Sequence, residues 1–327
     1  MSVRVAGCDP GTSSLDVVIL ADGEVCAEAR FAPDEVRRDP RAPIRWLEER
    51  GPFDLVAGPS GYGLPLLPAA RCGPRERELM ALVRPGDDAH GVGGFTKLVE
   101  AFCESALPVV FLPGVVHLPT VPAHRKINRI DLGTADKVCA VALALARRPG
   151  GTFCLLELGS AFTCCLAVER GRIVDGLGGT SGPMGWQSAG AWDGEAAYLL
   201  SPLSKHDLFR GGVHDVGDEE LARLAFREGC VKAVASLRAC TAFAEVVLSG
   251  RLIETQPALV ARLRQDLAGA SELESLPGAS MKHAAQGAAV IADGLAGGRW
   301  AELVRGLELR GASGTALDHL AHPRAGG

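Results

Sequence analysis

The chain opens with three short apolar segments that are separated by turn signals. The segments cover residues 3–7, 15–21 and 24–31, and Asp22-Gly23 between the last two is a strong signal for a tight hairpin. This pattern predicts an antiparallel β unit at the start of the chain.

The same arrangement recurs about 150 residues later. Apolar strand-like segments cover 153–158, 162–169 and 172–177, with a glycine turn at 159–161 and a second turn at 170–171. Strand, glycine turn, strand, turn and strand therefore occur twice. A repeat of structure at this distance predicts two halves that are built on the same plan.

Between and after these units, the spacing of apolar residues alternates between strand and helix periods. The predicted helices cover residues 40–49, 95–107, 134–147, 218–228, 230–243, 257–267 and 283–296. The additional predicted strands cover residues 54–58, 108–112, 245–248 and 272–276. Strands that alternate with helices indicate an α/β fold.

A length of 327 residues suits two domains better than one core. We place the first domain at 1–133, with an irregular, Pro- and Gly-rich insertion at about 59–125, although 76–83 has the pattern of a helical turn or two. The second domain covers 134–282. Residues 283–327 supply a helix that returns to the first domain, followed by a tail that we expect to be disordered from about 322.

The helices predicted at 134–147 and 283–296 are rich in alanine, and Gly287 lies within the second. Small residues let two helices approach closely. We therefore expect these helices to cross, to connect the domains and to act as their hinge. Ordinary core packing is the alternative explanation.

The composition of the chain argues against some classes of function. A formal net charge of −5 disfavours a non-specific nucleic-acid binder, and no apolar run is long enough to predict a membrane span. The ten cysteines are scattered and lack a C-x-x-C pair, which is typical of reduced thiols. Residues 1–7 lack the layout of a signal peptide, so we expect a cytoplasmic protein.

The first motif with chemical content follows the first predicted strand. Its sequence is Asp9-Pro10-Gly11-Thr12-Ser13. Gly11 lets the backbone turn sharply and approach a ligand, and the hydroxyls lie beside backbone amides. A carboxylate at such a turn suits hydrated Mg²⁺, while the amides suit phosphate oxygens. An ordinary β-turn with an aspartate is the alternative.

A second acid–glycine–hydroxyl motif lies at the same place in the second half, Glu157-Leu158-Gly159-Ser160-Ala161-Phe162-Thr163. Two such loops, one in each half, predict a clamp on a polyphosphate between the domains.

A third motif ends the strand predicted at 245–248, where Ser249-Gly250-Arg251 precedes a helix. Ligands of α/β sheets bind at the carboxyl ends of strands, and Gly250 would let a flat ring or ribose approach the backbone. We expect valine at this position to occupy the space of the ligand. A simple strand-to-helix turn gives the same pattern.

Asp136 is the first candidate for a catalytic base, and Asp131 is the second. Asp136 lies in the first turn of the helix predicted from 134, where the helix dipole favours the ionised form. Lys126, Arg129 and Lys137 supply nearby positive charge for an anionic acceptor or for the transferring phosphoryl group. Stabilisation of a helix end and solvated surface charge are the alternatives.

Together, these motifs resemble those of the acetate-kinase, sugar-kinase, Hsp70 and actin superfamily of two-domain ATP-binding proteins. Asp9 to Ser13 resembles the first phosphate motif, Glu157 to Thr163 the second, residues 248–251 the adenosine motif, and Gly287 with its neighbours the second connecting helix. The second phosphate motif usually opens with aspartate, whereas this chain has the longer Glu157.

The resemblance implies an α/β fold of two actin/hexokinase-like (ribonuclease H-like) domains with ATP and Mg²⁺ in the cleft between them. Asp9 would hold the metal. The residues that the resemblance assigns to the nucleotide are Asp9, Gly11, Thr12, Ser13, Glu157, Gly159, Ser160, Thr163, Ser249, Gly250 and Gly287.

Within the superfamily, the chain is most similar to an uncharacterised group labelled predicted butyrate kinases. The segment Gly133-Thr134-Ala135-Asp136-Lys137 is also similar to the Gly-Ala-Asp-Arg segment of type III pantothenate kinases, whose aspartate is taken as the base. This similarity implies the same role for Asp136.

The sequence therefore predicts an ATP-dependent kinase that transfers the γ-phosphoryl group to a hydroxyl or carboxylate of a small metabolite. A hydroxyl acceptor would require Asp136 as the base, and a carboxylate would not. One alternative is an ATP-binding scaffold or sensor that uses domain closure. Another is a kinase of methanopterin-type cofactor assembly. We expect no nucleic-acid or membrane partner, and a homodimer stays open.

Overall fold

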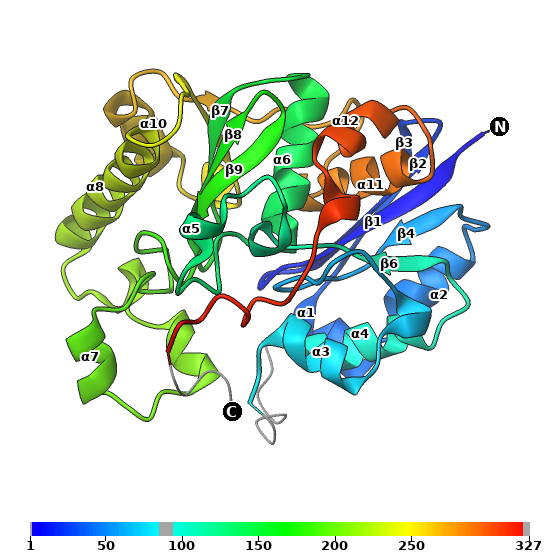
Figure 1. Cartoon of the computed structure of the whole chain (residues 1–327), viewed down its shortest axis with the longest axis horizontal. Coiled ribbons are helices and arrows are strands. Elements are labelled where there is room, and N and C mark those ends of the chain that lie inside the picture. Colours follow the sequence, from blue (N-terminus) through cyan, green and yellow to red (C-terminus); the bar gives the residue numbers. More distant parts are fainter. Residues whose placement is uncertain (1, 85–93, 323–327) are drawn as a thin grey trace.

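The computed structural model describes residues 2–84 and 94–322. The chain forms two mixed β-sheets, one from strands within residues 4–111 and the other from strands within 153–272 (Figure 1). The predicted α/β class with two similarly built halves is confirmed.

The first sheet has the strand order β3-β2-β1-β4-β6-β5. Its strands are β1 (Arg4–Pro10), β2 (Leu15–Ala21), β3 (Glu24–Phe31), β4 (Leu55–Ala57), β5 (Leu67–Pro68) and β6 (Val109–Phe111). Strands β1 to β3 form the predicted antiparallel unit, and β4 pairs in parallel with β1.

The second sheet repeats this plan with the strand order β11-β10-β7-β8-β9. Its strands are β7 (Phe153–Leu158), β8 (Thr163–Glu169), β9 (Arg172–Leu177), β10 (Glu245–Ser249) and β11 (Ser271–Glu272). Strands β7 to β9 are antiparallel, and β10 pairs in parallel with β7, as β4 does with β1. Asp9 and Glu157 therefore occupy similar places near the ends of equivalent strands.

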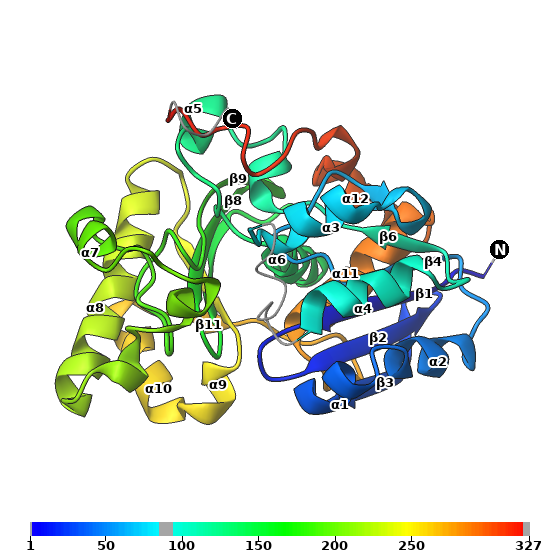
Figure 2. The same cartoon turned by 90° about the horizontal axis from the view of Figure 1, so that it is seen from below.

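Two helices fill the space between the sheets, α6 (Ala135–Arg147) and α11 (His283–Leu295) (Figure 2). Helix α11 packs against β1, β2 and β4, whereas α6 packs against α11 and β8. A Cβ atom at Gly287 would lie 1.7 Å from the carbonyl oxygen of Cys139, so only glycine permits this crossing. The predicted close contact is confirmed, while the hinge stays a prediction.

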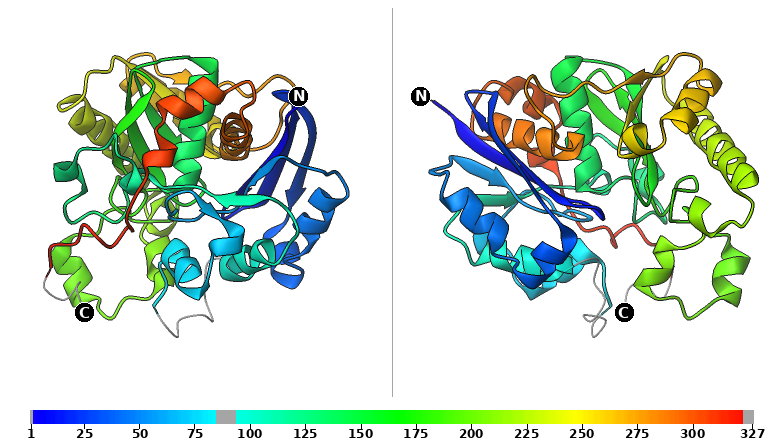
Figure 3. Two further views of the ribbon diagram at one scale, coloured as in Figure 1. Left: turned by 45° about the vertical axis from the view of Figure 1, so that its right-hand side comes forward. Right: turned by 180° about the vertical axis from the view of Figure 1, so that it is seen from behind.

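The strands alternate between two apolar layers, as the period of two requires. Val5 and Val18 face α6 and α11, whereas their neighbours Ala6 and Val17 face the outer helices of the first half. Those helices are α1 (Pro33–Arg38), α2 (Ala42–Glu48), α3 (Pro74–Ala81) and α4 (Phe95–Cys103). Two further views show the strands of the two sheets on opposite sides of the central helices (Figure 3).

The outer face of the second sheet is covered by α8 (Glu219–Arg238) and α10 (Pro257–Asp266). The prediction of separate helices at 218–228 and 230–243 was wrong, because α8 continues through Gly229. Phe226, Cys230 and Val234 continue one buried face at helical spacing. Their burial outweighs the cost of one interior glycine, which is about 1 kcal/mol.

Within the stretch 59–125, the helix predicted at 95–107 is α4, the strand predicted at 108–112 is β6 and the helical turns predicted at 76–83 are α3. The short strand β5 was not predicted, and together with β6 it completes the edge of the first sheet. Prolines at 108 and 113 bracket β6, and three buried residues suffice for a strand there. The remaining helices are α5 (Ala123–Lys126), α7 (Gly194–Leu199), α9 (Leu252–Thr255) and α12 (Ala301–Gly306).

Among the described residues, no helix combines the length and the apolar character that crossing a membrane would need. The predicted tail falls largely in 323–327, which lie outside the described residues.

We predict that Gly287→Ala lowers the free energy of unfolding by about 3 kcal/mol, because the new methyl group meets backbone atoms of α6. Gly306→Ala is the matched control, since a Cβ there has no neighbour within 4 Å and α12 accepts alanine. Urea unfolding measures both variants, and equal stability of the two would contradict the packing assignment.

Candidate functional site

A cavity of about 630 Å³ lies between the two halves of the molecule. The ends of β1, β7 and β10 and the first turns of α6 and α11 contribute to its walls. The sequence-predicted residues that line it are Asp9, Gly11, Thr12, Ser13, Asp131, Asp136, Glu157, Gly159, Ser160, Ser249 and Gly250.

The first glycine loop, residues 9–14, is a tight turn that a lysine ammonium group contacts. The amide of Gly11 donates to the carbonyl oxygen of Ser14 at 3.0 Å. Lys282, immediately before α11, places its Nζ 3.4 Å from Oδ2 of Asp9 and donates to the Ser14 carbonyl oxygen at 2.6 Å. Sequence reasoning missed Lys282, because no local pattern marks a lysine that reaches a loop some 270 residues away.

Asp16 holds the first glycine loop and Lys282 in place. Its side chain is fully buried, forms an ion pair with Arg30 at 2.7 Å and accepts from the Ser14 hydroxyl and the Lys282 amide. Burial alone would raise the pKa of Asp16, but the hydrogen bonds from Arg30 and the charge of Lys282 outweigh it and lower that pKa. The stabilisation from this carboxylate is therefore lost as pH falls through its lowered pKa.

The second glycine loop meets the first across the cavity. The Gly159 amide donates to the carbonyl oxygen of Phe162 at 3.0 Å. The hydroxyls of Ser160 and Thr12 lie 2.8 Å apart and share a hydrogen bond. The two hydroxyl loops therefore face each other, as the repeat predicts.

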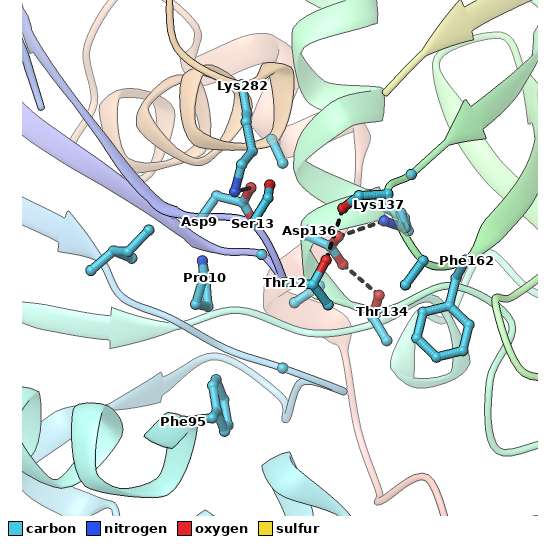
Figure 4. A pocket seen from close by; sticks show the side chains of 18 of the residues that line it. Asp9, Pro10, Thr12, Ser13, Phe95, Thr134, Asp136, Lys137, Phe162 and Lys282 are labelled. Atoms are coloured by element: carbon cyan, nitrogen blue, oxygen red, sulfur yellow. Dashed lines mark hydrogen bonds and ion pairs between the residues drawn. The ribbon is translucent and has the colours of Figure 1, made fainter. Parts of the chain in front are cut away.

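A cluster of three charges lies beside these loops at the start of α6. Nζ of Lys137 lies 2.6 Å from Oδ2 of Asp136 and 2.8 Å from Oε2 of Glu157. The hydroxyl of Thr134 donates to the other carboxylate oxygen of Asp136. Figure 4 shows this cluster on one side of the site and Asp9 with Lys282 on the other.

Burial and charge have opposite effects on these pKa values. Burial would lower the pKa of Lys137, but Asp136 and Glu157 raise it well above its usual value, so the ammonium stays charged. Burial would raise the pKa of Asp136, but Lys137 and Thr134 lower it. For Asp9 and Glu157 burial prevails, and their pKa values are raised. Asp136 is therefore the carboxylate best kept ionised.

Asp131 lines the cavity, but its oxygen atoms already have partners. They accept hydrogen bonds from the amides of Gly133 and Thr180 and from the Thr180 hydroxyl. Burial raises the pKa of Asp131 despite these bonds. This geometry suits a residue that holds the loop after β9 against the start of α6 better than it suits a base.

The loop after β10 also reaches the cavity. The hydroxyl of Ser249 lies 2.9 Å from Nδ1 of His283, and burial lowers the pKa of His283 to about 4. Gly250 has φ of +104°, and a Cβ there would lie 2.4 Å from the carbonyl oxygen of Leu158. A valine here would therefore do more than occupy ligand space: the positive φ and the clash with Leu158 favour the alternative in which such a variant is unstable with or without ligand.

Four residues that the sequence placed near the ligand lie elsewhere. Gly287 contacts α6, and Thr163 is buried in the pairing of β7 with β8. Lys126 is buried and donates to the carbonyl oxygen of Leu118, while Arg129 is exposed outside the cavity lining. Of the three basic residues predicted to hold an anion, only Lys137 lines the cavity.

The residues present fit Mg²⁺ that is bound together with phosphates. Mg²⁺ favours oxygen ligands and commonly uses one or two carboxylates along with water and substrate oxygens. Asp9 offers such oxygens on the cavity wall. Within 2–84 and 94–322 there is no group of three or more His, Cys, Asp or Glu residues that would hold an ion by itself.

A family model described as "Protein of unknown function (DUF1464)" matches residues 7–322. The chain belongs to this family. No curated protein matches the sequence.

Solved structures show what the fold resembles. Acetate kinase from Entamoeba histolytica superposes with a TM-score of 0.56 at 11% identity, covering 81% of this chain and 86% of that one. A ROK family glucokinase from Streptomyces griseus, in complex with glucose and AMPPNP, gives 0.47 at 15% identity, with 88% and 99% covered. Component A of the Acidaminococcus fermentans (R)-2-hydroxyglutaryl-CoA dehydratase gives 0.46 at 13%, with 90% and 99% covered.

At identities this low, the similarity supports only the fold. The likeness to acetate kinase confirms the predicted two-domain actin/hexokinase-like fold. What the family's members bind or convert does not follow from this likeness.

We predict that Gly250→Ala lowers the free energy of unfolding by about 3 kcal/mol, both with and without ATP, because strain and a backbone clash combine. Gly269→Ala is the matched control, since its φ is +93° but a Cβ there meets nothing within 4 Å. Thermal unfolding should show a clearly smaller loss for the control. A stable Gly250→Ala variant would remove the steric argument.

Proposed function

We propose that this protein is an ATP-dependent phosphotransferase that acts on a small metabolite. The observation that carries the proposal is the meeting of the two glycine–hydroxyl loops through Thr12 and Ser160, beside charged side chains at the starts of α6 and α11. Loop hydroxyls together with ammonium and carboxylate groups suit a metal-bound triphosphate.

In this proposal the nucleotide lies along the cavity from the β10 loop to the two glycine loops. Ser249 and Gly250 line the end that would take adenosine, and Gly11 and Gly159 lie where the phosphates would be. Lys282 contributes positive charge over the first loop. A cavity of about 630 Å³ falls within the range usual for ligand sites.

Asp9 is the residue that would hold Mg²⁺, whose chemistry is to neutralise charge on the phosphate oxygens. The protein's own contribution is orientation. Lys282 and Asp16 fix the loop that carries Asp9, while Thr134 and Lys137 fix the carboxylate of Asp136.

The transfer itself needs one new bond and one broken bond. An acceptor oxygen bonds to the γ-phosphorus while the bond from that phosphorus to the β–γ bridging oxygen breaks, and ADP leaves with the electron pair. If the acceptor is a hydroxyl, its proton moves to the carboxylate of Asp136. If it is a carboxylate, no proton is transferred and the base is dispensable.

We predict that Asp9→Asn weakens binding of Mg·ATP about tenfold or more, because one charged oxygen ligand of the metal is lost. Titration calorimetry measures the affinity. Asp39→Asn, which removes a surface partner of Arg45, is the matched control and should bind like the wild type. Unchanged affinity in a folded Asp9→Asn variant would reject the site.

We predict that Asp136→Asn keeps ATP affinity within a fewfold but lowers acceptor-dependent ADP release by about 10²–10⁴-fold. A coupled assay with a hydroxyl acceptor measures the rate, and calorimetry measures the affinity of the same preparation.

Near-wild-type turnover of Asp136→Asn would reject the residue as base and favour a carboxylate acceptor. ATP binding without turnover for any added metabolite would instead point to the scaffold or sensor function.

A further inference from the structure

The cavity continues past the glycine loops to a second group of residues that the phosphates would not reach. Tyr62 follows Gly61, whose carbonyl oxygen accepts a hydrogen bond from the amide of Ala135 at 3.0 Å. This end of the cavity therefore adjoins the first turn of α6, where Asp136 lies. We call it the distal subsite. Its lining residues are Tyr62, Phe95, Phe162, Thr180, Lys205 and Phe209.

Lys205 reaches across the cleft at the distal subsite. It begins a short 3-10 helix in the second half (Lys205–Phe209), and its partners come from the first half. Nζ lies 3.5 Å from the Tyr62 hydroxyl, 4.6 Å from the centre of its ring and 3.3 Å from the carbonyl oxygen of Leu82. Sequence reasoning missed this lysine, because its partners lie more than 120 residues away in the chain.

Within residues 2–84 and 94–322, the hydrogen bonds of the Lys205 ammonium go to neutral oxygens, the Tyr62 hydroxyl and the Leu82 carbonyl, and it forms no ion pair. Burial lowers the pKa of Lys205, and the charge of Asp131 opposes this only in part. A half-buried cation that forms no ion pair is stabilised by an incoming anion.

The part of the cavity beside the glycine loops favours a neutral acceptor group rather than an anion. Asp136, Glu157 and Asp9 bring three carboxylates to the neighbourhood of the transferring group. An anionic acceptor oxygen would meet like charges there, whereas a neutral hydroxyl can donate a hydrogen bond to Asp136.

Apolar rings also line this part of the cavity. Phe95 comes from the first half and Phe162 from the second, on opposite sides of the cavity (Figure 4). Phe209 contacts Phe162 edge-on at 4.8 Å. These rings suit a short carbon skeleton rather than a heavily hydroxylated sugar ring.

We propose that the acceptor is a small hydroxy acid, whose hydroxyl lies at Asp136 and whose carboxylate is bound by Lys205. This inference rests on the proposed phosphotransferase function and makes it specific. The hydroxyl oxygen takes the γ-phosphoryl group from ATP, its proton goes to Asp136 and ADP leaves. The carboxylate is not phosphorylated, and it gives the acceptor its orientation.

The experiment compares matched acceptors on the full chain. Glycerate, 3-hydroxypropanoate and 4-hydroxybutanoate are the hydroxy acids. Glycerol, 1,3-propanediol and 1,4-butanediol lack the carboxylate, and propanoate and butanoate lack the hydroxyl. Glycerol 3-phosphate tests a phosphate in place of the carboxylate. ADP release and calorimetric binding in the presence of AMPPNP are both measured.

We expect at least one hydroxy acid to bind and to be phosphorylated, with a KM well below that of its matched diol. Lys205→Met should raise this KM about tenfold or more, with kcat changed less, and Lys205→Arg should restore part of the affinity. Lys232→Met, on the exposed face of α8, is the matched control and should behave like the wild type.

Diols, plain carboxylates or glycerol 3-phosphate that act as well as the hydroxy acids would overturn the proposal, as would hydroxy-acid binding that is indifferent to Lys205→Met. The measured ATP affinity distinguishes a failure of the subsite assignment from a failure of the phosphotransferase proposal. If ATP binds normally but no hydroxy acid binds, the subsite assignment is wrong. If ATP does not bind, the phosphotransferase proposal itself fails.

Discussion

The close crossing of α6 and α11 is the constraint on which the rest of the structure depends. Gly287 lets the two helices touch at Cys139, and each helix also packs on one sheet. Their first turns consequently arrive at the same cleft. Asp136 and Lys137 come with one helix and Lys282 with the other, so one packing contact between small residues fixes charges from both halves of the molecule.

Charge balance is the second constraint. Buried charges are costly unless they are paired, and the charged side chains beside the two glycine loops form ion pairs. Lys137 pairs with Asp136 and Glu157, and Lys282 pairs with Asp9. Because these ammonium groups already lie in place, they can bind a polyphosphate with little reorganisation of the site.

Much of this could be predicted from the sequence, because strands and glycine loops are local signals. The repeat of the β1–β3 unit, and the loops that contain Thr12 and Ser160, follow from alternation and turn residues. Lys282 and Lys205 could not be predicted, since their roles depend on partners far away in the chain. Gly287 was placed at the nucleotide by its resemblance to the superfamily's second connecting helix, whereas in the structure it lies at the crossing with α6. The break near Gly229 was wrong because packing outweighs local propensity.

The most direct test of the central claim is a crystal structure with Mg²⁺ and a non-hydrolysable ATP analogue. The account predicts the triphosphate between the loops of Thr12 and Ser160, with their hydrogen bond at 2.8 Å replaced by contacts to phosphate oxygens and adenosine beside Gly250. An analogue bound elsewhere, with the Thr12–Ser160 hydrogen bond intact, would contradict it.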